Sequence, residues 1–220
     1  MSQTRRAVIA SALALAAAPA LAADKKSVEV GKAFPYLENY WKLPAADRSR
    51  FVVVYYLKRD GRPAAGLNGA IVHGAQRTPV SVAASGRVSP LPTLAQIRGK
   101  AKIEFDVPSD TKFSMGMQIE PAARPAAEMN AADLALAVTQ AAKGAKKVAG
   151  LMSLAMPTLD AVHFKGPPSG QAVLADGRVV TLPVVKGNPV FVPSTLRTAR
   201  TLRFPRAPTL AMFGTADGGG

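Results

Sequence analysis

The 220-residue sequence contains no cysteine, only two histidines, one tryptophan and half as many acidic as basic residues. Without cysteine the chain can form no disulfide framework, Cys-ligated zinc site or iron–sulfur cluster, and it has no thiol nucleophile. Two histidines are a poor basis for a transition-metal site, so we expect neither a metal nor a cofactor. With 48% apolar and 19% charged residues, the composition is nevertheless that of a globular chain.

Motifs that mark nucleotide sites and serine hydrolases are also missing. No strand is followed by Gly-x-Gly-x-x-Gly, and no Gly-x-x-x-x-Gly-Lys-Ser/Thr phosphate loop occurs. The nucleophile-elbow pattern Gly-x-Ser-x-Gly does not occur either. The glycines of Ser85-Gly86 and Asp176-Gly177 are therefore interpreted as turn residues of hairpins.

Residues 1–22 are typical of a cleavable signal peptide. Arg5-Arg6 forms a basic start, residues 7–21 carry no charge, and the small-x-small pattern of Ala20-Leu21-Ala22 predicts cleavage before Ala23. A retained membrane anchor is the alternative, but it needs about 20 strongly apolar residues, and this stretch is shorter and rich in alanine. The arginine pair also resembles the twin-arginine export pattern, although an ordinary secretion signal explains it equally well.

No second apolar stretch is long enough to span a membrane, so we expect a periplasmic or secreted protein that is not transmembrane. Removal of the signal leaves 198 residues with 26 basic and 14 acidic side chains, a net charge of +12. Such a charge indicates an anionic partner.

The first half of the mature chain is dominated by predicted strands. Residues 51–57 form a β-branched and aromatic run that ends at the turn signal Lys58-Arg59-Asp60-Gly61. Apolar and aromatic spacing predicts a helix over 35–42, and Pro44 is expected to open a helical turn through Arg48. Further strands are expected at 70–73, 79–83, 102–107 and 112–119.

The second half begins with a predicted helix. Asn130 is a good N-cap, and an apolar stripe follows it up to Gly150. The Ala- and Pro-rich residues 121–130 are interpreted as a linker, and the tail 214–220 as disordered. Further strands are expected at 158–165, 171–174, 178–182, 190–192, 201–204 and 209–213.

The two halves share a pattern that predicts a tandem duplication. Gly86–Pro92 and Gly177–Pro183 both read Gly-Arg-Val-x-x-Leu-Pro, and His73 and His163 precede them by 13 and 14 positions. Chance is the alternative, because these residue types are common here. We expect an α+β fold in which a helix followed by an antiparallel sheet occurs twice, with one continuous sheet shared by both units as a further option. The predicted units are 23–120 and 131–213.

Few side chains suggest catalysis. His73 and His163 titrate near neutrality and could serve a small exported hydrolase, but no partner residues are recognisable and we favour a structural role. Glu104 and Asp106 share one strand face, as a pair of catalytic carboxylates would, although nearby lysines favour surface ion pairs. We therefore predict no catalytic residue.

Basic side chains are concentrated in the second half, where they suggest an anion-binding surface or simply a solvated basic face. Export and few aromatic residues disfavour nucleic acid. We expect a non-enzymatic exported protein that engages an anionic lipid, a polysaccharide or an acidic protein of the cell envelope. A small hydrolase and an envelope-assembly factor or lipid carrier are the alternatives, the carrier needing an apolar groove between the repeats. The predicted anion-binding residues are Lys165, Lys186, Arg197, Arg200, Arg203 and Arg206.

Overall fold

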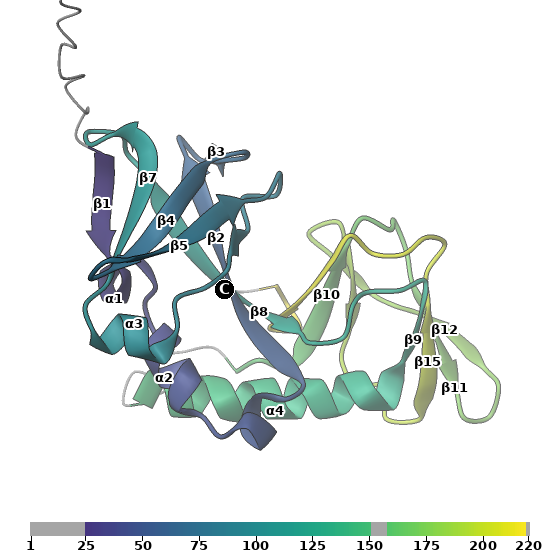
Figure 1. Cartoon of the computed structure of the whole chain (residues 1–220). Coiled ribbons are helices and arrows are strands. Elements are labelled where there is room, and N and C mark those ends of the chain that lie inside the picture. Colours follow the sequence, from purple (N-terminus) through teal and green to yellow (C-terminus); the bar gives the residue numbers. More distant parts are fainter. Residues whose placement is uncertain (1–24, 151–157, 219–220) are drawn as a thin grey trace, which may run out of the picture.

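A computed structural model of the chain describes residues 25–150 and 158–218 (Figure 1). The described chain consists mainly of antiparallel sheets with a few helices, so the α+β class is confirmed. The predicted signal at 1–22 and its cleavage site lie outside the described residues. Over the ranges that are described, no helix is both long and apolar enough to cross a bilayer.

Strands of the first half form two sheets, with the strand orders β1-β7-β4-β5-β6 and β3-β2-β8. Three short helices, α1 (Val30–Ala33), α2 (Leu37–Lys42) and α3 (Leu94–Arg98), lie together at one end of these sheets (Figure 1). A 3-10 turn, η1 (Ala45–Arg48), lies where Pro44 predicts one. The strands are β1 (Lys25–Glu29), β2 (Phe51–Arg59), β3 (Arg62–Pro63), β4 (Asn68–His73), β5 (Gln76–Val82), β6 (Val88–Ser89), β7 (Lys102–Pro108) and β8 (Ser114–Pro121).

Strands of the second half form two further sheets, with the orders β13-β14-β10-β16 and β12-β11-β15-β9. Among the described residues no strand ladder joins a sheet of the first half to one of the second, so the single continuous sheet considered for the two halves is not formed. The strands are β9 (Glu128–Asn130), β10 (Ala161–Lys165), β11 (Gln171–Leu174), β12 (Val179–Thr181), β13 (Val184–Val185), β14 (Asn188–Phe191), β15 (Ala199–Arg203) and β16 (Leu210–Gly214).

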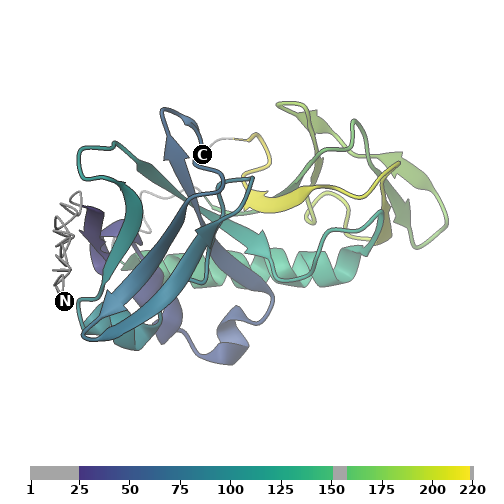
Figure 2. The same cartoon turned by 45° about the horizontal axis from the view of Figure 1, so that its top comes forward.

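The long helix α4 (Ala131–Ala149) lies across both halves and contacts β2, β8, β10 and β15 (Figures 1 and 2). It begins where the sequence predicts, because the Asn130 side chain accepts a hydrogen bond from the Asp133 N–H at 3.0 Å. Its apolar stripe is buried as expected, and one hydrophobic cluster runs from the first half through α4 into the second. The buried stripe comprises Leu134, Ala137, Val138, Ala141, Ala145 and Val148.

Three local expectations differ from the structure. The helix expected over 35–42 begins only at Leu37, because Tyr36 has a left-handed backbone with φ of 65° and points into solvent. The segment interpreted as a linker, 121–130, contains the strand β9. The tail expected to be disordered is placed through Gly218, whose carbonyl accepts a hydrogen bond from Lys186 Nζ at 2.8 Å.

Strand pairing follows the same scheme in both halves. In the first half, β1 precedes helix α1 and pairs with β7, which comes much later in the chain. In the second half, β9 precedes helix α4 and pairs in the same way with β15. The pairs β2–β8 and β10–β16 are likewise antiparallel.

Gly86 and Gly177 have similar local geometry, because each donates its N–H to the carbonyl three positions earlier, at 2.8 and 3.1 Å, with φ of 87° and 85°. Their turns lie at different places in the two sheets. Gly86 connects β5 to β6, whereas Gly177 connects β11, the strand that pairs with β15 as β4 pairs with β7, to β12. The two histidines do not correspond, since His73 is on β4 and His163 on β10.

Candidate functional site

The six predicted anion-binding residues are spread over several elements of the second half. Arg200 and Arg203 lie on β15, Lys165 ends β10, and Lys186 stands in the β13–β14 turn. Arg206 lies beside Lys165, because its guanidinium donates to the carbonyl of Gly166. Arg197 is in the turn before β15, where its Nε donates to the Ser194 carbonyl at 3.1 Å.

Several of these cations already have partners within the protein. Arg203 Nε forms an ion pair with Glu128 at 3.2 Å, and Lys186 Nζ is bound to the Gly218 carbonyl. Arg200 and Arg203 thus share β15 but stand three positions apart on it, and only Arg206 is held next to Lys165, through the Gly166 carbonyl. The six residues are therefore not gathered at one point. The spacing of three along the sequence does not produce one face, because the chain changes from a turn to a strand at Ala199.

Neither histidine is arranged as a catalytic base. His163 is 7% exposed, and its Nε2 donates to the main-chain carbonyl of Thr215 at 2.8 Å. The Thr215 hydroxyl donates instead to Asp217 at 2.5 Å. The His73 ring packs against Gly99, where even a Cβ would collide with it. In the described ranges, no ion pair joins either ring to a carboxylate.

The carboxylates considered for catalysis are engaged in surface ion pairs, as the nearby basic residues suggested. Glu104 contacts Arg77 at 3.0 Å, and Asp106 contacts Lys25 at 2.7 Å. The hydrogen bond and charge of Lys25 lower the pKa of the Asp106 carboxyl below its usual value. Asp106 therefore pairs with a charge on the adjacent strand β1, and Glu104 pairs with a charge on β5, on the other side of β4.

A buried carboxylate, Glu120 on β8, is saturated by two neighbours. Its side chain accepts hydrogen bonds from the Tyr56 hydroxyl at 2.6 Å and from Arg87 at 3.0 Å. The pKa of the Tyr56 hydroxyl is raised, mainly by burial and secondly by its hydrogen bond to Glu120. Both carboxylate oxygens are occupied, so the group holds the Gly86 turn against β2 and β8.

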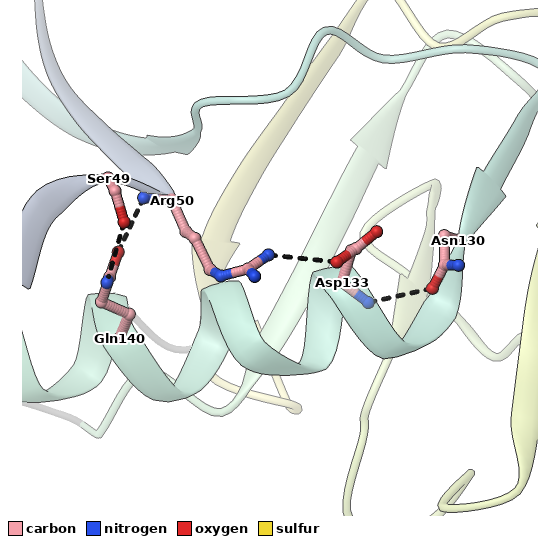
Figure 3. A network of polar contacts seen from close by, with 5 residues as sticks. All are labelled: Ser49, Arg50, Asn130, Asp133 and Gln140. Carbon is pink, nitrogen blue, oxygen red and sulfur yellow. Dashed lines mark hydrogen bonds and ion pairs between the residues drawn. The ribbon is translucent and has the colours of Figure 1, made fainter. Parts of the chain in front are cut away.

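Another polar cluster fixes η1 and the start of β2 on α4 (Figure 3). Gln140 accepts a hydrogen bond from the Arg50 N–H at 2.7 Å and donates to Ser49 Oγ at 3.2 Å. Arg50 pairs with Asp133 at 3.1 Å, which balances its charge. A cavity of about 360 Å³ adjoins this cluster, but its Arg50 is already paired with Asp133, and the Asn130 side chain caps the helix N-terminus beside it.

An apolar cleft lies between the two sheets of the first half. Its cavity volume is about 590 Å³, within the range of roughly 300–1,000 Å³ that is usual for small-molecule pockets. Its walls come from β1, α1, β2, β7, the β7–β8 loop and the start of β8. The apolar lining residues are Val28, Ala33, Pro35, Leu57, Ile103, Phe105, Phe113 and Met115.

Strand geometry explains why these side chains converge. On β1 and β7, Val28 lies opposite Ile103, so both point to the same side of their sheet. On β2 and β8, Leu57 lies opposite Met115 in the same manner. The centroid of the Phe113 ring lies 5.9 Å from that of Phe105, and Phe113 extends the apolar wall into the loop that precedes β8.

The charged lining residues of this cleft are all lysines. Lys26 and Lys112 come from the end formed by the β7–β8 loop, where Lys26 Nζ donates to the Ser109 carbonyl at 2.9 Å. Lys32 comes from α1, beyond the opposite end of β1. No carboxylate lines the cleft, and in the part of the chain that is described Lys32 and Lys112 make no ion pair.

These lysines were not recognised from the sequence, because the strand β1 and the start of β8 were not predicted where they occur. Residues 25–29 have no strong strand signal, so Lys26 and Val28 were not assigned to one inward face. Lys112 and Phe113 fall inside a predicted strand, 112–119, but the actual strand β8 begins at Ser114 and leaves them in the loop. The Lys-x-Val alternation at 26–28 was the available signal.

Comparisons of the chain with protein-family models, with curated proteins and with solved structures find no match.

Proposed function

We propose that this protein is a non-enzymatic, exported binding protein that holds an anionic amphiphile, an apolar chain with a carboxylate or phosphate head group, in the cleft of its first half. One observation carries the proposal: the cleft has an apolar floor, and its charged lining consists of Lys26, Lys32 and Lys112 without any carboxylate. The cleft is referred to below as the lysine-rimmed cleft.

The apolar floor accounts for binding of the chain. Each methylene group that leaves water for an apolar surface contributes about 0.8 kcal/mol. The floor is formed by buried side chains of β2 and β7, so it is present before any ligand arrives. A preformed floor avoids part of the entropy cost of ordering a site.

The lysines account for selection of the head group. An ammonium group offers up to three hydrogen-bond donors and a positive charge. Lys26 and Lys112 approach from one end of the cleft, so a head group located there would contact both, while its chain extends toward Leu57 and Ile103. Hydrogen bonds to a charged partner contribute about 1.5–3 kcal/mol each.

The proposal keeps the anionic partner expected from the sequence but changes the site. The cleft lies within the first half, whereas the carrier alternative required a groove between the halves. The second-half cations Lys165, Lys186, Arg197, Arg200, Arg203 and Arg206 are dispersed over several elements and lie outside this cleft.

Export and duplication complete the proposal. The basic start, uncharged run and Ala-x-Ala end of residues 1–22 support cleavage and export. The matched pairings β1–β7 with β9–β15 and β2–β8 with β10–β16 support a duplicated unit. In the second half the Phe164 and Phe204 rings lie 4.6 Å apart and occupy the space between its sheets, so the first half alone would keep the ligand site.

The test is a titration of the mature chain, residues 23–220, with palmitate and with the uncharged alcohol of the same chain length. We expect saturable binding of palmitate and weaker binding of the alcohol. The charge reversal Lys26→Glu/Lys112→Glu should weaken palmitate binding at least about tenfold, given the strength of charged hydrogen bonds. Met115→Trp, which fills the floor, should weaken binding of both compounds.

The matched control is Lys165→Glu/Arg200→Glu, which makes the same charge change on exposed positions of the second half. Its affinity for palmitate should equal that of the wild type. Binding that is absent in the wild type, or that is lost equally in the control and the cleft variant, would show that the lysine-rimmed cleft is not the site.

A further inference from the structure

A second group of cations lies beside the lysine-rimmed cleft, at the tip of the β2–β3 hairpin. Asp60 and Gly61 both have positive φ, 51° and 76°, which makes a tight two-residue turn of the kind that Asp-Gly favours. This turn places Arg59 directly opposite Arg62 in the strand register. Lys58, Arg59 and Arg62 are all exposed.

The hairpin tip and the cleft end belong to the same end of the molecule. Lys58 lies opposite Ser114 in the β2–β8 register, so the hairpin stands next to the β7–β8 loop that carries Lys112. Arg59 comes two residues after Leu57 on β2, so its side chain is on the same face of the strand as Leu57, the face that lines the cleft. Figure 1 shows the β2–β3 hairpin and the loop after β7 together at the top of the first half.

These cations are not neutralised within the protein. In the described ranges, Lys58, Arg59, Arg62 and Lys112 make no ion pair, whereas other surface charges of the first half pair with neighbours, as Arg77 does with Glu104. Two exposed acids, Asp60 and Asp110, belong to the same end, so a positive excess remains. Like charges directly opposite on paired strands are destabilising, so the Arg59–Arg62 pair is a cost that the fold itself does not require.

We propose that this basic end, formed by Lys26, Lys58, Arg59, Arg62 and Lys112, docks on an anionic lipid bilayer, so that the amphiphile passes directly between the bilayer and the cleft. The inference rests on the proposed function of the cleft and adds the place where its ligand is exchanged. A cluster of four to eight basic residues is the usual requirement for adsorption to anionic lipid, and arginine is suited to two-point contact with phosphate. Docking through this basic end would bring the end of the cleft that carries Lys26 and Lys112 to the head groups of the bilayer.

Two measurements on the mature chain test this inference. The first is sedimentation with vesicles of phosphatidylcholine alone or mixed with phosphatidylglycerol. We expect binding only to the anionic vesicles and a loss of binding at high salt. Arg59→Gln/Arg62→Gln should lower the partition coefficient roughly 25-fold, because each basic residue near the surface contributes about fivefold. Lys58→Gln/Lys112→Gln provides a second, independent variant with the same expected direction.

The second measurement is the rate at which a fluorescent fatty acid moves from the protein to acceptor vesicles. Direct exchange predicts a rate that increases with acceptor concentration and with anionic lipid content, and that falls in the Arg59→Gln/Arg62→Gln variant. The affinity of that variant for palmitate in solution should be unchanged. The control, Lys165→Gln/Arg200→Gln, should bind vesicles and transfer the ligand as the wild type does.

The two proposals fail in different ways. Transfer rates that do not depend on acceptor concentration, or vesicle binding that is equal in wild type and hairpin variants, would overturn docking while palmitate binding in solution remains. Absence of palmitate binding by the wild type would overturn the proposed function, and with it the exchange of ligand at this end. A control that loses vesicle binding as strongly as the hairpin variant would place the lipid contact in the second half and contradict the inference.

Discussion

Two neighbouring tyrosines of β2, Tyr55 and Tyr56, show how burial makes single side chains depend on pH. Burial raises the pKa of both phenols, and the hydrogen bond to Glu120 raises that of Tyr56 further. In the unfolded chain these groups lose their protons near pH 10. The native state keeps its protons to higher pH, so its stabilisation by the neutral phenols is complete below about pH 10 and declines as the pH rises above that value.

Tyr55→Phe tests this dependence. Wild type should lose free energy of unfolding between about pH 10 and pH 11.5, and each buried phenol should contribute up to about 1.4 kcal/mol per pH unit to that loss. The variant should show a shallower decline because it lacks one of these groups. Urea unfolding at several alkaline pH values measures both slopes, and identical slopes in the two proteins would contradict the assigned cause.

At the scale of single residues, the charges that matter most for the proposed site were the least visible in the sequence. Lys26 becomes a cleft residue only through its pairing with β7, opposite Phe105. The evenly spaced arginines from Arg197 to Arg206 were prominent in the sequence, but Arg197, Arg203 and Arg206 are positioned by three different local partners. Spacing along the chain identifies one face only where a single regular element contains all the residues.

Among the elements, α4 was predictable nearly in full, because its signals are local. The Asn130 cap and the 3.6-residue apolar period depend on neighbours in the sequence and require no knowledge of the sheets. Most long strands were also predicted to within a few residues. Short elements such as β1, β3, β9 and β13 were not, since β1 and β9 are ordered by partners more than 70 positions away and β3 and β13 by a tight turn. Of these strands β1 lines the cleft, which is why Lys26 and Val28 were missed.

Gly144 gives an element-scale prediction within α4. Glycine lowers helix propensity by about 1 kcal/mol relative to alanine, so sequence reasoning alone favours Gly144→Ala as a stabilising change. In the structure the Phe51 ring lies so close to Gly144 that an added Cβ would collide with it. We therefore expect Gly144→Ala to lower the free energy of unfolding by about 1–3 kcal/mol, the usual cost of overpacking.

The control is Thr139→Ala, an exposed position of the same helix whose hydroxyl only bonds back to the Ala135 carbonyl. This change should be neutral or slightly stabilising. Chemical denaturation of both variants compares the helix-propensity gain with the collision. If Gly144→Ala is as stable as Thr139→Ala, Phe51 does not pack on α4 as described.

For the whole molecule, the matched strand pairing of the two halves raises the question of whether they fold as two domains. The hydrophobic cluster argues that they do not. It joins Phe51 and Tyr55 of the first half to Phe164 and Leu202 of the second, with Ala141 of α4 between them. A unit that lost α4 would expose the apolar faces of β2 and β15 together. Duplication of a unit is thus compatible with a single core, provided that one helix covers both copies.

This organisation predicts one cooperative unfolding transition for the mature chain. The single tryptophan, Trp41, belongs to the first half and donates its indole N–H to the Pro92 carbonyl at 2.8 Å, so its fluorescence reports that half alone. Far-UV circular dichroism reports both halves. The two signals should have coincident midpoints in urea, as expected for a two-state transition, and Ala141→Gly should shift both by the same amount because α4 is shared. A fluorescence transition that precedes or follows the dichroism transition would show that the halves unfold separately. Hydrogen exchange of β2 and β11 peptides would then assign the less stable half, because each would open with its own free energy.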